Sequence, residues 1–101
     1  MTEYITKWGQ ETHKFKTLKN ALKWAYKTAI DPDNKGRMHF SDIRVETAKA
    51  HKFVGYVSTF NGIPEFIGES FFSATPMYRY LNPDGTTGAV RTYKSGNTNR
   101  K

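Results

Sequence analysis

The chain has 101 residues, enough to bury one hydrophobic core without the support of disulfides or metals. It contains no cysteine, which excludes a disulfide framework and cysteine-based zinc sites. Aromatic residues make up 15% of the chain, which argues against disorder throughout. Sixteen Lys and Arg against nine Asp and Glu give a net charge of +7, which favours nucleic acid or an acidic protein surface as the partner.

The N-terminal residues lack the apolar run of a signal peptide, and no apolar run reaches the length of a membrane span. We therefore expect a cytoplasmic protein with no membrane partner. The positive charge is uneven, because residues 1–30 hold six lysines and only two glutamates. This first third of the chain therefore holds +4 of the net charge of +7.

Two short strands and a helix are predicted at the start of the fold. Tyr4–Trp8 reads as a strand, and residues 12–15 add a second one after a turn. Thr17 is a typical N-cap for a helix over Leu18–Ile30, which Asp31-Pro32 should end. The apolar residues of this helix recur at the spacing of one buried face: Leu18, Ala21, Leu22, Ala25 and Ala29.

The next segment is predicted to be a loop followed by an irregular strand. Residues 31–36 carry the Asp, Pro, Asn and Gly that are typical of turns. Residues 38–47 read as a strand whose apolar alternation slips near Ser41-Asp42, and a β-bulge at that point is the simplest explanation.

Residues 53–72 contain the strongest local signal, two β-rich runs around Asn61-Gly62. This dipeptide predicts a two-residue hairpin turn with positive φ at both positions, and it sets Phe60 opposite Ile63. The same register places Gly55 opposite Gly68 and leaves a gap that an aromatic ring or another backbone can enter. Pro64 predicts that the second strand begins at an edge of the sheet.

The C-terminal part predicts one further hairpin and a tail. Residues 77–81 form a strand, the sequence Asn82-Pro83-Asp84-Gly85 is typical of a type I turn, and residues 86–92 return as a weak strand. Residues 94–101 are polar and basic, without an apolar residue to bury. We predict one domain over residues 1–93 and a disordered basic tail over residues 94–101.

These elements predict an α+β fold, a mostly antiparallel sheet of about five strands with one amphipathic helix packed on one face. The core should join the apolar helix face to apolar positions of the strands, because a 3.6-residue period and a 2-residue period meet there. The expected contacts are those of Leu18, Leu22, Ala25 and Ala29 with Ile43, Val45, Val57 and Phe66.

No catalytic residue, metal site or cofactor is predicted. His13, His39 and His51 are dispersed, and although two histidines and a lysine could cleave RNA by acid–base catalysis, nothing in the sequence brings them together. Asp31 and Asp33 match calcium-ligand positions of an EF-hand loop, but Lys35 stands where an oxygen ligand belongs. We therefore expect a binding protein rather than an enzyme.

Nucleic-acid binding is the function that the sequence favours. Lysines recur every three to four residues through the predicted helix, with Trp24 on a neighbouring flank, and could form a row of phosphate contacts. Two tyrosines of one strand could stack on bases, and the basic tail could supply a second phosphate contact. The candidate residues are Lys16, Lys19, Lys23, Lys27, Trp24, Tyr78, Arg79, Tyr80, Lys94, Arg100 and Lys101.

The alternative is a protein-interaction or inhibitor module that binds an acidic partner surface. The same lysines would serve it, and so would an exposed edge strand or the exposed aromatic residues of the hairpin. A row of lysines is also the ordinary solvated side of an amphipathic helix, and strand tyrosines are often packing partners. The sequence does not separate these interpretations.

Overall fold

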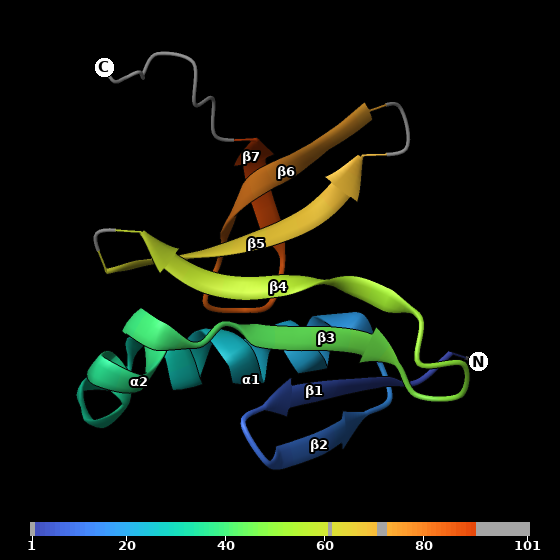
Figure 1. Ribbon diagram of the computed structural model, residues 1–101, viewed down its shortest axis with the longest axis horizontal. Helices are drawn as coiled ribbons and strands as arrows, with labels where there is room; N and C mark the ends of the chain where they lie inside the picture. Colours follow the sequence, from blue (N-terminus) through green and yellow to red (C-terminus); the bar gives the residue numbers. More distant parts are fainter. Residues whose placement is uncertain (1, 61, 71–72, 91–101) are drawn as a thin grey trace.

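One antiparallel sheet with a helix against one of its faces forms the fold (Figure 1). The computed structural model describes residues 2–60, 62–70 and 73–90, and within them it has seven strands, two α-helices and one 3-10 turn. The strand order across the sheet is β2-β1-β3-β4-β5-β6-β7, and every neighbouring pair is antiparallel. The elements are β1 (Tyr4–Trp8), β2 (Glu11–Phe15), α1 (Leu18–Ile30), η1 (Pro32–Asn34), α2 (Lys35–Phe40), β3 (Ile43–Thr47), β4 (Phe53–Phe60), β5 (Ile63–Ser70), β6 (Ser73–Leu81) and β7 (Thr87–Val90).

The predicted α+β class and antiparallel sheet are confirmed, but the prediction of about five strands and one helix is wrong. The two outermost strands, β2 and β7, are short, and four of the five residues of β2 are exposed. Both segments were expected as short strands, at residues 12–15 and 86–92, although the sheet as a whole was expected to have only about five. Strand β2 shows no apolar alternation, and pairing with β1 holds it in place. The second helix, α2, lies in a segment that the sequence predicted as loop and strand.

Helix α1 has the predicted bounds and the predicted buried face. The hydroxyl of Thr17 accepts a hydrogen bond from the backbone N–H of Asn20 at 3.1 Å, which caps the first turn. The helix ends at Ile30, and Asp31 is in an extended conformation before Pro32. Its buried residues are Ala21, Leu22, Ala25 and Ala29.

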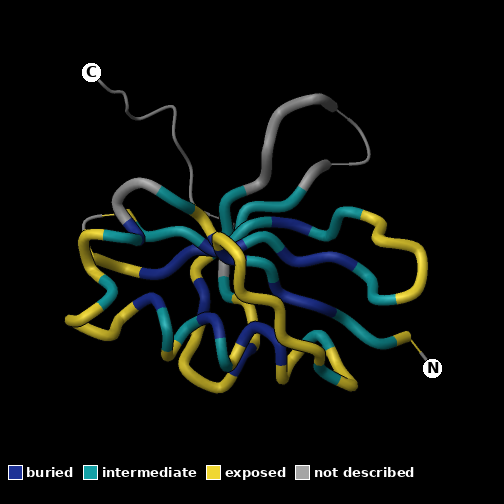
Figure 2. Tube along the Cα trace, turned by 60° about the horizontal axis from the view of Figure 1, so that its bottom comes forward, coloured by how far each residue is buried: buried dark blue, intermediate teal, exposed yellow. Residues whose placement is uncertain are grey.

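The core lies between α1 and the middle of the sheet, and buried stretches occur both in the helix and in the strands that cross it (Figure 2). Leu22, Ile43, Val45 and Val57 are fully buried, and Leu18 and Phe66 pack against them from the margin. This agrees with the predicted core. The remaining large members of the cluster are Trp8, Met38 and Leu81.

The central hairpin has the predicted register, with Phe60 opposite Ile63 and Tyr56 opposite Ile67. Gly62 has a φ of +81°, as the turn requires, and Asn61 lies outside the described residues. The gap at Gly55 is filled by a ring, because a Cβ added there would lie 2.6 Å from Cζ of Phe66. An aromatic ring therefore enters the space beside Gly55, one of the two alternatives that the sequence left open, while the observed pairs of β4 and β5 begin at Tyr56 and Ile67.

The predicted sheet edge at Pro64 is wrong. Strand β5 lies inside the sheet, between β4 and β6. Its pairing with β6 begins at Glu65, opposite Tyr80, one residue after the proline. A proline can open an interior strand where pairing with one neighbour has not yet begun, because its missing N–H then breaks no ladder bond.

Residues 32–40 are helical rather than loop and strand. The Asp31 carboxylate accepts the N–H of Asp33 at 2.9 Å, and Pro32 follows as the first residue of η1. Helix α2 then places Met38 in the core. The predicted bulge near Ser41-Asp42 is therefore wrong, since β3 begins only at Ile43 and its pairing with β4 shifts between Val45 and Glu46.

The sheet curves so that both of its ends reach α1, which passes behind β3 in Figure 1. At one end, β2 contacts the helix through Trp24. At the other end, the predicted turn after β6 forms, with the Gly85 N–H donating to the Asn82 carbonyl at 3.0 Å. Gly85 lies against the helix backbone, because an added Cβ would overlap the carbonyl oxygen of Lys19.

Candidate nucleic-acid interface

Three lysines lie on the outer side of α1 and a fourth, Lys16, just precedes its N-cap; we call Lys16, Lys19, Lys23 and Lys27 the lysine ridge. All four are exposed. Each step of four residues turns the helix by about 40° and advances it by about 6 Å, so the last three lysines stay on one side, away from the buried face. Helix α1 contains no Asp or Glu, so no carboxylate of its own neutralises them.

Within the part of the chain that the structure describes, the ridge also lacks ion pairs to other elements. In the described ranges, Glu3 pairs with Lys14 at 3.1 Å, Glu11 pairs with Arg37 at 2.6 Å, and Glu46 pairs with cations of the sheet. No ridge lysine takes part in an ion pair within residues 2–60, 62–70 and 73–90. Carboxylates and cations thus neutralise one another around β1, β2 and β3, while the ridge keeps its charge.

One carboxylate lies near the N-terminal end of the ridge. Hydrogen bonds from the hydroxyl of Thr86 at 2.6 Å and from its N–H at 3.0 Å hold the pKa of Asp84 below its usual 3.8, and the positive charge of Lys19 lowers it further. The turn that carries Asp84 is the one that packs on α1 through Gly85. Lys19 is therefore partly compensated, whereas Lys23 and Lys27 lie further along the helix.

Trp24 packs between elements instead of standing beside the ridge as a free ring. Its ring centroid lies 4.6 Å from that of His13 and 6.0 Å from that of Phe15, both on β2. The side chain is partly buried against the core. These contacts fix β2 to α1, and they leave the ridge without a stacking platform at Trp24.

The candidate residues of β6 lie on two different faces of the sheet. Tyr78 pairs with Ile67, which pairs with Tyr56, and this row lies on the face opposite α1. Arg79 pairs with Phe66, which pairs with Val57, so it belongs to the face that α1 covers. Tyr80 lies two residues further along the strand, on the same face as Tyr78, and is 41% exposed. The tyrosines and the lysine ridge therefore lie on opposite sides of the protein.

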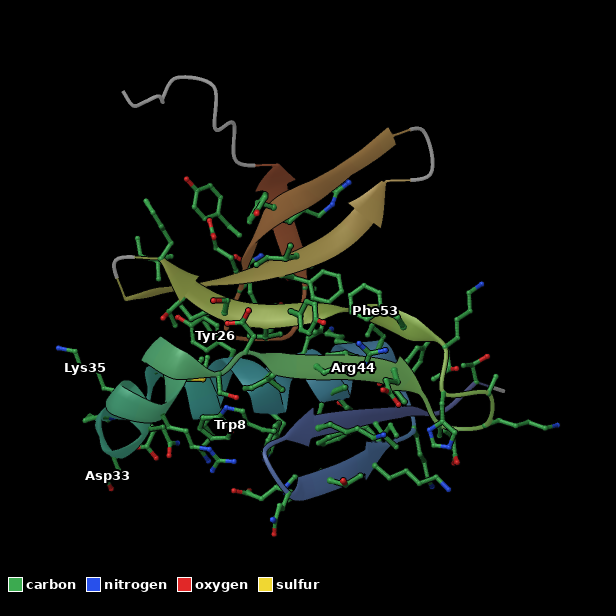
Figure 3. All side chains as sticks on the ribbon, in the orientation of Figure 1. Trp8, Tyr26, Asp33, Lys35, Arg44 and Phe53 are labelled. Carbon is green, nitrogen blue, oxygen red and sulfur yellow. The ribbon has the colours of Figure 1, made fainter. Side chains whose placement is uncertain are left out.

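A charged cluster on the open side of the sheet was missed from the sequence. The Glu46 carboxylate is nearly buried, and it accepts a hydrogen bond from Arg44 at 2.5 Å, with Lys7 at 3.4 Å and His51 at 3.3 Å. The Arg44 guanidinium also lies 4.7 Å from the ring of Phe53 (Figure 3). Arg44 and Glu46 lie two residues apart on β3, whereas the strand register brings Lys7 of β1 and Phe53 of β4 to them.

The electrostatics of this cluster are internally balanced. Burial alone would raise the pKa of Glu46, but hydrogen bonds from Arg44, His51 and Lys7 outweigh it, so the pKa lies below the ordinary 4.5. An anion on this side would compete with a carboxylate that already binds the cations. The cluster is thus better suited to holding β1, β3 and β4 together than to binding phosphate.

Two further findings concern metal binding and membrane-spanning helices. Among the described residues, no three His, Asp or Glu side chains lie close enough to hold a metal ion. None of the helices in that part of the chain is long and apolar enough to cross a membrane. Lys94, Arg100 and Lys101, together with the predicted end of the domain at residue 93, lie outside the described residues and stay predictions.

Comparisons with protein-family models, with curated proteins and with solved structures found no match for this chain.

Proposed function

We propose that this protein binds nucleic acid through the lysine ridge of α1. The observation that carries the proposal is a row of exposed lysines along a helix without carboxylates, whereas Lys7, Lys14, Arg37 and Arg44 each pair with an acidic residue. Phosphate groups are the anions that would take these contacts, and neutralising them releases counterions from the nucleic acid. The basic residues Lys94, Arg100 and Lys101 would add further phosphate contacts.

The proposed binding is independent of base sequence. Lysine presents a flexible point charge that contacts phosphate well but does not read base edges by itself. Three aromatic residues are adjacent in sequence to ridge lysines, and all three are engaged: Trp24 contacts His13 and Phe15, and Tyr26 packs against the core. Tyr78 and Tyr80 lie on the other side of the sheet and would not meet the same strand of nucleic acid as the ridge.

The test is a salt titration of wild type and of the triple variant Lys19→Gln, Lys23→Gln and Lys27→Gln on duplex DNA, single-stranded DNA and RNA. Glutamine is a good helix former, and all three positions are exposed, so the fold should survive. Each lost contact should reduce the slope of log K against log salt by about 0.9 on duplex DNA and about 0.7 on a single strand. We expect a total reduction of about two to three units, similar for unrelated sequences.

A matched control removes the same charge elsewhere. Lys14, Lys49 and Lys52 are exposed on β2 and on the turn before β4, and their exchange for glutamine also removes three positive charges. The control variant should keep most of the wild-type slope. Equal slopes for the two triple variants would show that net charge rather than the ridge drives binding.

An acidic protein surface is the other partner class that fits an exposed basic helix. If wild type binds none of the nucleic acids at low salt, the nucleic-acid proposal is wrong, and the acidic protein partner takes its place. If wild type does bind nucleic acid, direct competition between oligonucleotides and an acidic partner protein would establish whether the two share the ridge.

A further inference from the structure

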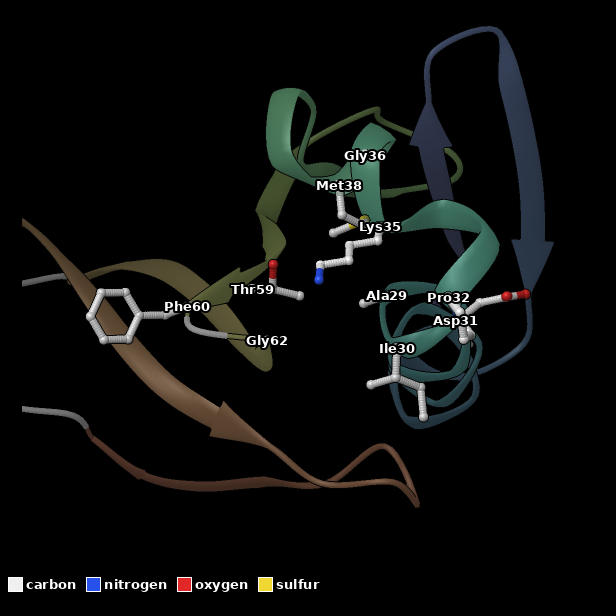
Figure 4. Close-up of a pocket in the computed structure, with 10 residues that line it drawn as sticks. All are labelled: Ala29, Ile30, Asp31, Pro32, Lys35, Gly36, Met38, Thr59, Phe60 and Gly62. Carbon is white, nitrogen blue, oxygen red and sulfur yellow. The ribbon is translucent and has the colours of Figure 1, made fainter.

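A groove of about 870 Å³ lies between the C-terminal end of α1, helix α2 and the β4–β5 hairpin (Figure 4). Its walls are mainly apolar side chains from all three parts of the fold, namely Ala29, Ile30, Pro32, Met38 and Phe60. Ile30 is 49% exposed and Phe60 is 47% exposed, which is unusual for large apolar side chains. A volume in this range with predominantly apolar walls is typical of small-molecule sites.

One cation enters this apolar groove. The side chain of Lys35 extends from the start of α2 into the groove, and its amine points toward Thr59 on β4 (Figure 4). No carboxylate of the described residues forms an ion pair with Lys35. The carboxylate of Asp31 points away from the amine in the same view and accepts the N–H of Asp33 at 2.9 Å.

We propose that this groove binds a small amphipathic carboxylate, such as a medium-chain or aromatic acid. The carboxylate would contact the amine of Lys35 and the hydroxyl of Thr59, and the apolar part would cover Ala29, Met38 and Phe60. An anion is selected because the cation beside the apolar walls is exposed and has no ion-pair partner in the described ranges, so a carboxylate can approach its amine while the apolar part of the ligand covers the walls. The site is separate from the lysine ridge, and nucleic-acid binding does not depend on it.

The test uses three probes with the same alkyl chain and different head groups: octanoate, 1-octanol and octylammonium. Binding is followed by the methyl NMR signals of Ile30 and Met38, below the concentrations at which the probes aggregate. A ligand of this size should bind with a Kd on the order of 1 mM. We expect saturable shifts with octanoate and affinity at least about tenfold weaker for octylammonium, because it brings a second cation to Lys35.

Two variants and one control separate the roles of charge and apolar contact. Lys35→Gln should weaken octanoate about tenfold and abolish the preference over octanol, whereas Phe60→Ser should weaken octanoate and octanol alike. Lys35 and Phe60 are exposed, so neither change should unfold the protein. Lys49→Gln, which removes an exposed lysine outside the groove, should leave all three affinities unchanged.

Three results would overturn the proposal. These are equal affinities for octanoate and octylammonium, the same loss of octanoate affinity in Lys49→Gln as in Lys35→Gln, and the absence of saturable shifts at about 10 mM octanoate. The second result would mean that octanoate responds to the net charge of +7 and not to this groove.

Discussion

At the scale of single residues, the clearest anomaly is a buried hydroxyl. Thr6 is fully buried on β1, and its Oγ1 has no hydrogen-bond partner among the described residues. It lies opposite Val45 and His13 in the register of the sheet. Burying a hydroxyl without a partner costs about 1–3 kcal/mol by protein mutational data, so this position weakens the fold that it belongs to.

The first prediction is that Thr6→Val stabilises the protein. Valine has nearly the same shape and lacks the hydroxyl, so the free energy of unfolding should rise by about 1 kcal/mol. Urea denaturation of wild type and variant measures the change. Thr6→Ala is the control, since it removes the hydroxyl but leaves a cavity beside Val45 and should not stabilise. A lower midpoint for Thr6→Val would mean that the hydroxyl has a partner in the folded protein.

The second prediction concerns the pH dependence that Glu46 produces. Its pKa in the folded protein lies below the ordinary 4.5, so the folded state holds this carboxylate charged more strongly than the unfolded state does. The resulting stabilisation is present above the unfolded pKa and is lost as the pH falls through the folded pKa. The midpoint temperature of thermal unfolding of wild type should therefore fall steadily as the pH is lowered below about 5.

The variant Glu46→Gln tests whether Glu46 causes this pH dependence. The informative quantity is the slope of the thermal midpoint against pH, not the stability at one pH. The amide cannot titrate, so the midpoint temperature should decrease less steeply as the pH falls. Part of the decrease should remain, because the pKa values of Glu11 and Asp84 are also lowered in the folded protein. The absolute stability of the variant should fall at neutral pH, because Arg44 and Lys7 lose their carboxylate. An unchanged acid slope would contradict the role of Glu46.

At the scale of elements, the contact between α1 and the β6–β7 turn decides how the sheet closes around the helix. Gly85 has a φ of +89°, and an added Cβ would overlap the Lys19 carbonyl oxygen and lie 3.0 Å from the backbone nitrogen of Lys23. Backbone atoms cannot rotate away as a long side chain can. The turn therefore requires glycine for its conformation and also for its close approach to the helix.

The third prediction compares Gly85→Ala with Gly62→Ala. Both glycines have positive φ, but an added Cβ at Gly62 has no atom within 4 Å. Gly62→Ala should cost about 1 kcal/mol from backbone conformation alone. Gly85→Ala should cost clearly more, because the turn must also move away from α1 and expose Leu81. Equal costs, measured by denaturant unfolding, would show that the turn does not pack on the helix.

At the scale of the whole molecule, charge is segregated between two sides. The open side of the sheet pairs Lys7, Arg44 and Glu46 with one another, while the helix side carries the lysine ridge without carboxylates of its own. Long-range attraction of a polyanion should therefore orient it toward α1. The apolar groove with Lys35 lies beyond the C-terminal end of this helix and is separate from the ridge.

The fourth prediction is that removal of residues 94–101 leaves folding intact. This segment has no apolar residue to bury, so the thermal midpoint should stay the same. It carries Lys94, Arg100 and Lys101, so nucleic-acid affinity should fall and the salt slope should shrink by up to about three units. A clear drop in the midpoint would show instead that the tail docks on the fold.

Local signals were enough to predict α1 and the central hairpin. An N-cap, one apolar face and a proline stop describe α1, and Asn61-Gly62 sets the register of β4 and β5, which the observed pairs match. The segment after α1 was misread because Asp31-Pro32 both ends one helix and begins the next. A helix as short as α2 has little stability of its own, and the burial of Met38 supports it.

The sequence by itself determined that Lys19, Lys23 and Lys27 lie away from the apolar face of α1, because helical periodicity fixes their direction around the helix axis. Tertiary structure alone decided that Trp24 packs on β2, that Tyr78 and Arg79 lie on opposite faces, and that Lys35 enters an apolar groove. The reason is physical. Periodicity acts over a few neighbouring residues, whereas strand order and curvature depend on which distant segments bury one another's side chains.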